Sequence, residues 1–269
     1  MGGAERTARK RRQQQQAAGK QAVAKARGGI DSKRIGIIVG VVVLIAAVVV
    51  GGLIWTNSSQ NATEGQTIPT SQVPASQYPE QRDGLVAVTG NPDAPVTIDV
   101  YADFLCPVCG RFQQEFGKQI NEKVAQGELL LRTHMVPLLV DASTPAGYSL
   151  DAANASLLAA DAGKFTAFHD SLFAHQPEEG KRGYSKEQLI QLGRDLGITD
   201  QAFAAGINNG KFDQQLTAEM QRISEDSSLH QDFGGRSGFG TPTVTHDGKI
   251  VDFAADPQWL DKLTANAGS

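Results

Sequence analysis

Two cysteines, Cys106 and Cys109, lie three positions apart directly after the apolar run Val96–Phe104, and the sequence contains no others. The run has the composition of a strand, and a helix that begins at Cys106 would point its unpaired N–H groups and positive dipole end at that sulfur. Pro107 then stands at the first helical position, where no N–H is needed. The pattern predicts a redox dithiol in which Cys106 has a lowered pKa and is the attacking thiol.

Two other interpretations of the pair are a static disulfide and half of a zinc site. Zinc needs four ligands, usually a second cysteine pair or two histidines three to five residues apart. The five histidines do not have this spacing: His134, His169, His175, His230 and His246. We therefore expect no metal site, and a Cys-x-x-Cys motif after a strand favours the redox dithiol over the static bond.

An uncharged stretch rich in Val and Ile runs from Gly36 to Trp55. Twenty helical residues at 1.5 Å each span about 30 Å, the thickness of one hydrocarbon core. A cleaved signal peptide is the rival interpretation, but its apolar part would be about 7 to 15 residues long and end in a small-residue cleavage site. The sequence predicts a single transmembrane anchor over residues 35–55, with Trp55 at the interface.

The charges flanking this stretch predict its orientation. Residues 1–34 contain ten Lys/Arg and two acidic residues, whereas the rest of the chain contains 15 Lys/Arg and 27 Asp/Glu. The positive-inside rule then keeps the basic tail in the cytoplasm, and the domain after the anchor lies outside the cell membrane. Beside a membrane the tail is expected to attract anionic lipid and not nucleic acid, and to lack a fold of its own. A dithiol outside the cytoplasm lies in an oxidising compartment.

Residues 56–81 are rich in Ser, Thr, Gln, Asn and Pro, which predicts a flexible extracytoplasmic linker. Residues 82–269 fit one α/β domain. Within it, Val96–Tyr101 and Glu128–Met135 read as strands around a helix over Cys106–Ala125 that ends before Gly127. A strand–helix–strand unit implies a parallel pair of strands with a right-handed crossover.

The centre of the domain, from about residue 144 to 228, has helical spacing of its apolar residues throughout. Ser185 and Gln188 form the pattern of a capping box at the start of one of these helices. Strands return at Thr243–Thr245 and Lys249–Phe253, which flank the two-residue hairpin signal Asp247-Gly248, and a short helix follows Pro257. The Gly-rich residues 234–240 lack both known phosphate-loop spacings and are expected to form a flexible loop.

The segment Asp103-Phe-Leu-Cys-Pro-Val-Cys109, the helical insertion, and Gly240-Thr-Pro-Thr-Val244 before a hairpin together resemble the DsbA-like thioredoxin-fold family over about residues 84–266. The resemblance implies an α/β thioredoxin-like fold with an inserted helical subdomain, here preceded by a single transmembrane helix. It further implies that Cys106 is the nucleophile and Cys109 the resolving cysteine, with Pro107 and Val108 completing the active-site motif. Thr241-Pro242 corresponds to the family's cis-proline loop, which pairs with the substrate backbone.

One departure from the family pattern concerns a buried acid six residues before the first cysteine. That position is Val100 here, and the neighbouring Asp99 alternates onto the other face of the strand. The nearest substitute is Asp103, which is a possible auxiliary residue or a cap of the helix that follows.

These patterns predict a membrane-tethered thiol:disulfide oxidoreductase without a cofactor, which donates disulfides to reduced exported proteins. The resemblance implies an actinobacterial cell envelope and a quinone-linked membrane thiol oxidase as the recycling partner. Two alternatives stay open. One is a reductase of the same fold that delivers electrons outward, and the other is a non-enzymatic envelope binding module with a static disulfide.

Overall fold

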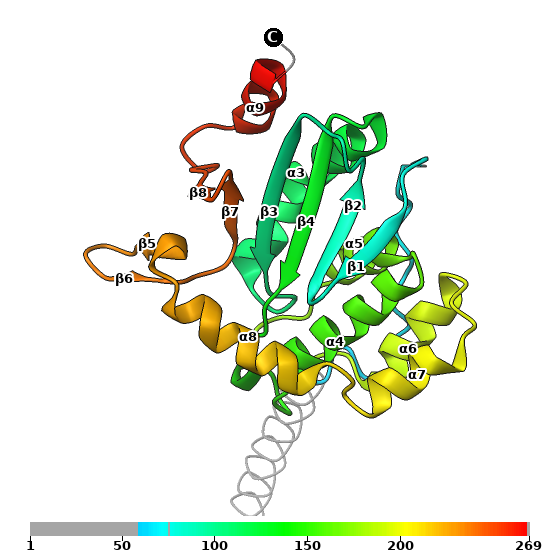
Figure 1. Ribbon diagram of the computed structural model, residues 1–269. Coiled ribbons are helices and arrows are strands. Elements are labelled where there is room, and N and C mark those ends of the chain that lie inside the picture. The colour runs from blue at the N-terminus through cyan, green and yellow to red at the C-terminus, as the bar shows by residue number, and fades with distance from the viewer. Residues whose placement is uncertain (1–58, 75, 268–269) are drawn as a thin grey trace, which may run out of the picture. The chain divides into compact units, whose positions relative to one another are not determined.

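A six-stranded sheet with the strand order β1-β2-β4-β3-β7-β8 forms the centre of the structure, a computed structural model that describes residues 59–74 and 76–267 (Figure 1). Only β3 and β4 run parallel, and every other neighbouring pair in this sheet is antiparallel. The strands are β1 Glu80–Asp83, β2 Val86–Gly90, β3 Val96–Ala102, β4 Leu129–Met135, β7 Thr243–His246 and β8 Lys249–Ile250.

Helix α3, Pro107–Gln126, connects the two parallel strands, as the sequence predicts. Its predicted apolar stripe is buried: Phe112, Phe116, Ile120 and Val124. Gly127 adopts φ 77° and ends the helix, since its N–H bonds back to the carbonyl of Val124 and a left-handed backbone suits glycine. The strand–helix–strand prediction is therefore confirmed.

The expected helical insertion lies between β4 and β7. It comprises η1 Val140–Ala142, α4 Tyr148–Asp161, α5 Phe165–Ala174, α6 Lys186–Asp195, α7 Gln201–Asn208, α8 Asp213–Glu225 and η2 Ser227–Leu229. Helix α4 is buried along most of its length and contacts α5, α6, α7 and α8 (Figure 1). The predicted capping box is present, because the Ser185 hydroxyl accepts from the Gln188 N–H while the Gln188 side chain accepts from the Ser185 N–H.

The C-terminal elements return to the sheet. Asp247 and Gly248 have φ values of 50° and 70°, the left-handed conformations that a tight two-residue hairpin needs between β7 and β8. The second strand is shorter than expected and ends at Ile250. Helix α9, Trp259–Ala267, begins two residues after Pro257, and the Trp259 ring lies 5.8 Å from that of Phe116 on α3.

Four short strands were not expected from the sequence, namely β1, β2, β5 Gln231–Asp232 and β6 Ser237–Gly238. Strands β1 and β2 lack a polar/apolar alternation, and β2 is placed between β1 and β4 through its pairing with both. The Gly-rich segment is not a plain loop: β5 pairs with β6 in a small hairpin. The Phe233 N–H donates to the Arg236 carbonyl and closes its turn.

The expected flexible linker over residues 56–81 differs from the structure in the part that is described. The Thr63 hydroxyl donates to the carbonyls of Arg182 and Gly183, at 2.9 and 3.1 Å, and the Gln188 amide donates to the carbonyl of Thr63. Ile68 is 2% exposed within the main apolar core. Composition alone suggested a tether, but hydrogen bonds to the insertion and one buried isoleucine hold residues 59–74 against the domain.

The predicted cytoplasmic tail (1–34) and anchor (35–55) lie outside the described residues. Within residues 59–74 and 76–267, none of the helices has the length and apolar character that a membrane crossing requires.

Candidate functional site

The dithiol lies where β3 ends and α3 begins. Cys106 is the N-cap residue of α3 with an extended backbone (φ −71°, ψ 117°), Pro107 is the first helical residue, and Cys109 lies in the first turn. Both cysteines are free thiols, 7% and 1% exposed respectively. The sulfur at the helix start is therefore the more accessible one, in the position that the sequence predicts.

The two thiols have opposite pKa shifts. A hydrogen bond from the Cys109 side chain, helped by the Thr241 side chain and the backbone N–H groups of Val108 and Cys109, lowers the pKa of Cys106 to about 6 against the opposing effect of burial. Burial raises the pKa of Cys109 well above its usual range, and the neighbouring Cys106 raises it further. At neutral pH Cys106 is therefore the cysteine that ionises, and the more deeply buried Cys109 stays a thiol.

The Thr241-Pro242 segment lies against this pair. The Cys106 Sγ donates to the Thr241 carbonyl at 3.4 Å, across 135 positions of sequence. The Thr241-Pro242 bond is cis, as the resemblance implies. A residue that the sequence did not reveal holds this loop: the Gln231 amide lies 2.6 Å from the Thr243 hydroxyl and 3.4 Å from the carbonyls of Gly240 and Pro242.

Asp103 is buried beneath the turn that leads into α3, with 1% exposure. One carboxylate oxygen accepts from the Leu105 N–H at 2.7 Å, and the other accepts from the Leu139 N–H at 2.8 Å and the Ser149 hydroxyl at 2.5 Å. It does not cap α3, whose N-cap Cys106 has no side-chain capping bond. Burial raises the pKa of Asp103, and its three partners oppose that shift. Asp103 therefore fastens the turn to the segment after β4 and to α4.

The strand alternation at Val100 and Asp99 is as expected. Val100 is buried on the α3 side of the sheet, whereas the Asp99 carboxylate on the opposite face accepts from His134 Nε2 at 2.7 Å and Arg132 Nε at 3.2 Å. Asp99 is thus directed away from the dithiol.

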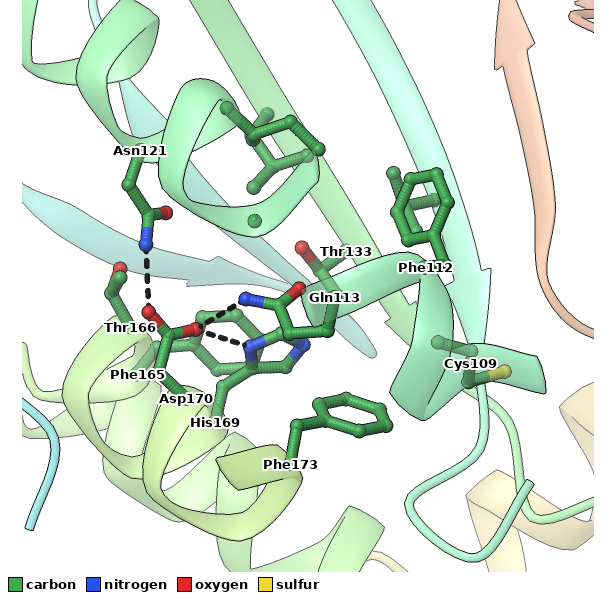
Figure 2. A pocket seen from close by; sticks show the side chains of 15 residues that line it. Cys109, Phe112, Gln113, Asn121, Thr133, Phe165, Thr166, His169, Asp170 and Phe173 are labelled. Carbon is green, nitrogen blue, oxygen red and sulfur yellow. Dashed lines mark hydrogen bonds and ion pairs between the residues drawn. The ribbon is translucent and has the colours of Figure 1, made fainter. Parts of the chain in front are cut away.

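A small cavity lies between α3, α5 and the sheet, lined in part by Val100, Cys109 and Phe173 (Figure 2). It has about 20 Å³ open to water, room for roughly one molecule. On its polar side Asp170 accepts from Gln113, Asn121 and His169 at 2.9, 2.7 and 2.9 Å. Cys109 lines the cavity, but its sulfur points away from these groups (Figure 2), and the network joins α3 to α5.

Three large apolar side chains of the described residues are exposed: Val108 (43%), Leu138 (39%) and Phe233 (55%). Val108 lies between the two cysteines. Leu138 precedes the residue whose N–H binds Asp103, and the ring of Phe233 lies directly over Gly240. Each of these side chains therefore belongs to a segment that builds the site. In the same part of the chain, no group of three or more His, Cys, Asp or Glu residues is arranged to hold a metal ion.

Comparisons of the sequence and of the structure with known proteins point to the same family. The family model described as Thioredoxin matches residues 84–264. Among solved structures, oxidised DsbA of Mycobacterium tuberculosis is 25% identical with a TM-score of 0.57, and the alignment covers 72% of this chain and 94% of that one. MdbA of Corynebacterium matruchotii, a thiol-disulfide oxidoreductase, shares the fold at 18% identity with a TM-score of 0.55, covering 71% of this chain and 93% of that one.

Curated relatives match only through part of their length. Serine/threonine-protein kinase PknE of Mycobacterium tuberculosis is 31% identical over 180 residues, which are 65% of this chain and 30% of the kinase. The Na(+)/H(+) antiporter NhaA 1 of Mycolicibacterium gilvum is 30% identical over 169 residues, 60% of this chain and 23% of the antiporter. The chain therefore spans less than a third of the length of either relative.

Proposed function

The chain belongs to the thioredoxin family as a DsbA-like member, and from this premise we propose that it is a protein thiol–disulfide oxidoreductase that donates disulfides to exported proteins. The observation that carries the proposal is the position of Cys106 at the start of α3, where Cys109, Thr241 and two backbone N–H groups favour its thiolate. A thiolate stabilised in this way is both a good nucleophile and a good leaving group.

The reaction begins with the oxidised pair. A substrate thiolate attacks the Cys106 sulfur, the Cys106–Cys109 bond breaks, and a mixed disulfide forms between substrate and Cys106. The departing Cys109 sulfur takes up a proton, as its raised pKa favours. A second substrate thiolate then attacks the substrate's own sulfur in the mixed disulfide and expels Cys106 as a thiolate. Two electrons have passed from the substrate dithiol to the protein dithiol, and the low pKa of Cys106 favours this last step.

The proposed substrate is an extended, reduced polypeptide. The Thr241 carbonyl lies beside the Cys106 sulfur that bonds to the substrate, and Thr241-Pro242 is the segment we assign to pairing with substrate backbone. The exposed side chains of Val108, Leu138 and Phe233 offer apolar contacts to chains whose own apolar residues are not yet buried.

We assign the domain to the outer side of a cell membrane, held by the anchor predicted over residues 35–55, with the basic tail 1–34 in the cytoplasm near anionic lipid. The dithiol must be reoxidised after each cycle, and a quinone-linked membrane thiol oxidase is the recycling partner that the family resemblance supports.

The test is the equilibrium of the purified chain in glutathione buffers, read from the redox state of Cys106 and Cys109. We expect a potential between roughly −200 and −120 mV, on the oxidising side of thioredoxin at about −270 mV. The low pKa of Cys106 stabilises the reduced form, and this makes the disulfide a stronger oxidant. A potential below about −250 mV, with Cys106 reduced in cells, would instead support an outward-directed reductase. Failure to oxidise any dithiol peptide would leave only a binding module.

A further inference from the structure

The backbone turn that presents Cys106 is held by a residue from the helical insertion. Gln176 lies two residues after the end of α5, and its side-chain amide donates to the Phe104 carbonyl at 3.0 Å and to the Cys106 carbonyl at 2.9 Å. These are the two carbonyls that border Leu105. The single NH₂ group of Gln176 thus bonds to both carbonyls and links the two ends of the turn.

The same turn is held on its other side by Asp103. The Asp103 carboxylate accepts from the Leu105 N–H, and the Asp103 carbonyl accepts from the Cys106 N–H at 3.1 Å. The Cys106 carbonyl also accepts the first helical bond, from the Gly110 N–H at 3.1 Å. Gln176 is the member of this set that comes from outside the strand–helix connection, 70 positions away from Cys106.

The space for the Gln176 amide exists because residue 110 is glycine. A Cβ at Gly110 would overlap Gln176 Oε1, so a larger residue would push the amide away from the turn. Gly110 has an ordinary helical conformation inside α3, where glycine is less favourable than alanine by roughly 1 kcal/mol. Helix α3 thus has glycine, a residue of low helix propensity, at the position that faces the Gln176 side chain.

We propose that Gln176 is a positioning residue of the dithiol, which fixes the backbone on both sides of Leu105 and thereby the direction in which α3 presents the Cys106 sulfur. The inference rests on the proposed function in taking Cys106 as the nucleophile. Its physical basis is that Cys106 is favoured as a thiolate by N–H groups of Val108 and Cys109, and these interactions weaken when the preceding turn relaxes. Cys109 is the titratable group bonded to that sulfur, and Asp103 lies behind the turn.

The test compares Gln176→Leu, Gln176→Glu and Gly110→Ala in the full chain. The leucine removes both hydrogen bonds, and the glutamate places acceptor oxygens and a negative charge against two carbonyls. Both should raise the pKa of Cys106, measured from thiolate absorbance against pH. Both should also lower the oxidising strength, by about tenfold in the glutathione equilibrium constant for the glutamate, or about 30 mV. Gln114→Glu is the matched control, since it adds the same charge at an exposed position of α3.

Gly110→Ala separates positioning from stability. It should lower the free energy of unfolding by less than Gln176→Leu does, because the better helix propensity of alanine offsets part of the cost of the lost hydrogen bonds, and yet shift the Cys106 pKa in the same direction. The double variant Gly110→Ala/Gln176→Leu should shift the Cys106 pKa little further than Gln176→Leu alone, because both substitutions remove the same hydrogen bonds. If all three variants keep the Cys106 pKa and the glutathione constant within twofold of the unmodified chain, the proposal is wrong. These readouts concern the dithiol alone, so they remain informative even if no substrate is oxidised.

Discussion

Cys106 and Cys109 are separated by only two residues, yet their chemical environments differ sharply. The first lies at a helix start beside the Thr241 carbonyl, and the second is almost fully buried with a raised pKa. This asymmetry assigns the mixed disulfide with the substrate to the Cys106 sulfur, and leaves Cys109 as the buried thiol that can displace the substrate from it when the exchange runs in reverse.

Trapping experiments test that assignment. Cys109→Ala should accumulate covalent complexes with exported proteins that contain a disulfide, because the Cys106 thiolate attacks that disulfide and expels one substrate thiolate, and no Cys109 thiol is left to displace the other from the mixed disulfide. Cys106→Ala should accumulate none, because the remaining thiol is buried and weakly acidic. Nonreducing gels of cells expressing each variant would show the complexes, and equal trapping by both variants would contradict the assignment.

At the residue scale, the sequence predicted the active-site motif but not the side chains that hold the neighbouring backbone in place. Cys106, Pro107 and Cys109 could be predicted because their roles depend on neighbours within one helical turn. Pro242 could be predicted only through the family resemblance. Gln176 and Gln231 could not, because a glutamine has no characteristic spacing and each acts on backbone carbonyls outside its own element, 70 positions away for Gln176 and nine to eleven for Gln231.

At the scale of elements, single polar residues join the helical insertion to the strand–helix unit that carries the dithiol. Ser149 of α4 reaches Asp103, and Asp170 of α5 reaches Gln113 and Asn121 of α3 (Figure 2). The helices themselves were predictable from their apolar periodicity. The short strands β1 and β2 were not, since β2 is a strand through its pairing with β4 and β1 through its pairing with β2.

Ser149→Ala tests the first of these links. The folded-state pKa of Asp103 is raised, so its ionisation costs stability as the pH rises through that pKa, and the Ser149 hydroxyl offsets part of this cost. The substitution should lower the free energy of unfolding by about 1–3 kcal/mol at neutral pH, and by less in acid where Asp103 is protonated. Urea unfolding at the two pH values measures the difference, and an equal loss at both would argue against a charged Asp103.

Asp170→Ala tests the second link. Three side-chain donors, from Gln113, Asn121 and His169, would lose their shared acceptor in a site with little access to water. We expect a loss of about 2–4 kcal/mol in urea unfolding. The exposed Asp195, which accepts only from Gln191 on its own helix among the bonds described, provides a control whose replacement should change stability by less than about 0.5 kcal/mol. Similar losses for both variants would show that the network contributes nothing specific.

For the whole molecule, the proposed topology can be tested with the chain's own chemistry. If the domain lies outside the membrane, a membrane-impermeant maleimide added to intact cells after an impermeant reductant should label Cys106. The Cys106→Ala variant is the control for background labelling. Labelling that appears only after the cells are lysed would place the domain on the inner side.

The contacts of residues 59–74 have a mechanical consequence. Tension applied from the N-terminal side of the chain first meets two sets of hydrogen bonds: the Arg182 N–H donates to the Gln60 carbonyl, and the Thr63 hydroxyl donates to the carbonyls of Arg182 and Gly183. It meets the sheet only afterwards, since the first strand starts at Glu80. The load is therefore taken up first by the segment between α5 and α6, which also carries Gln176, the residue bonded to the turn around Cys106. A pull on a tethered domain built in this way reaches the segment that positions the Cys106 sulfur before it reaches the strands of the sheet.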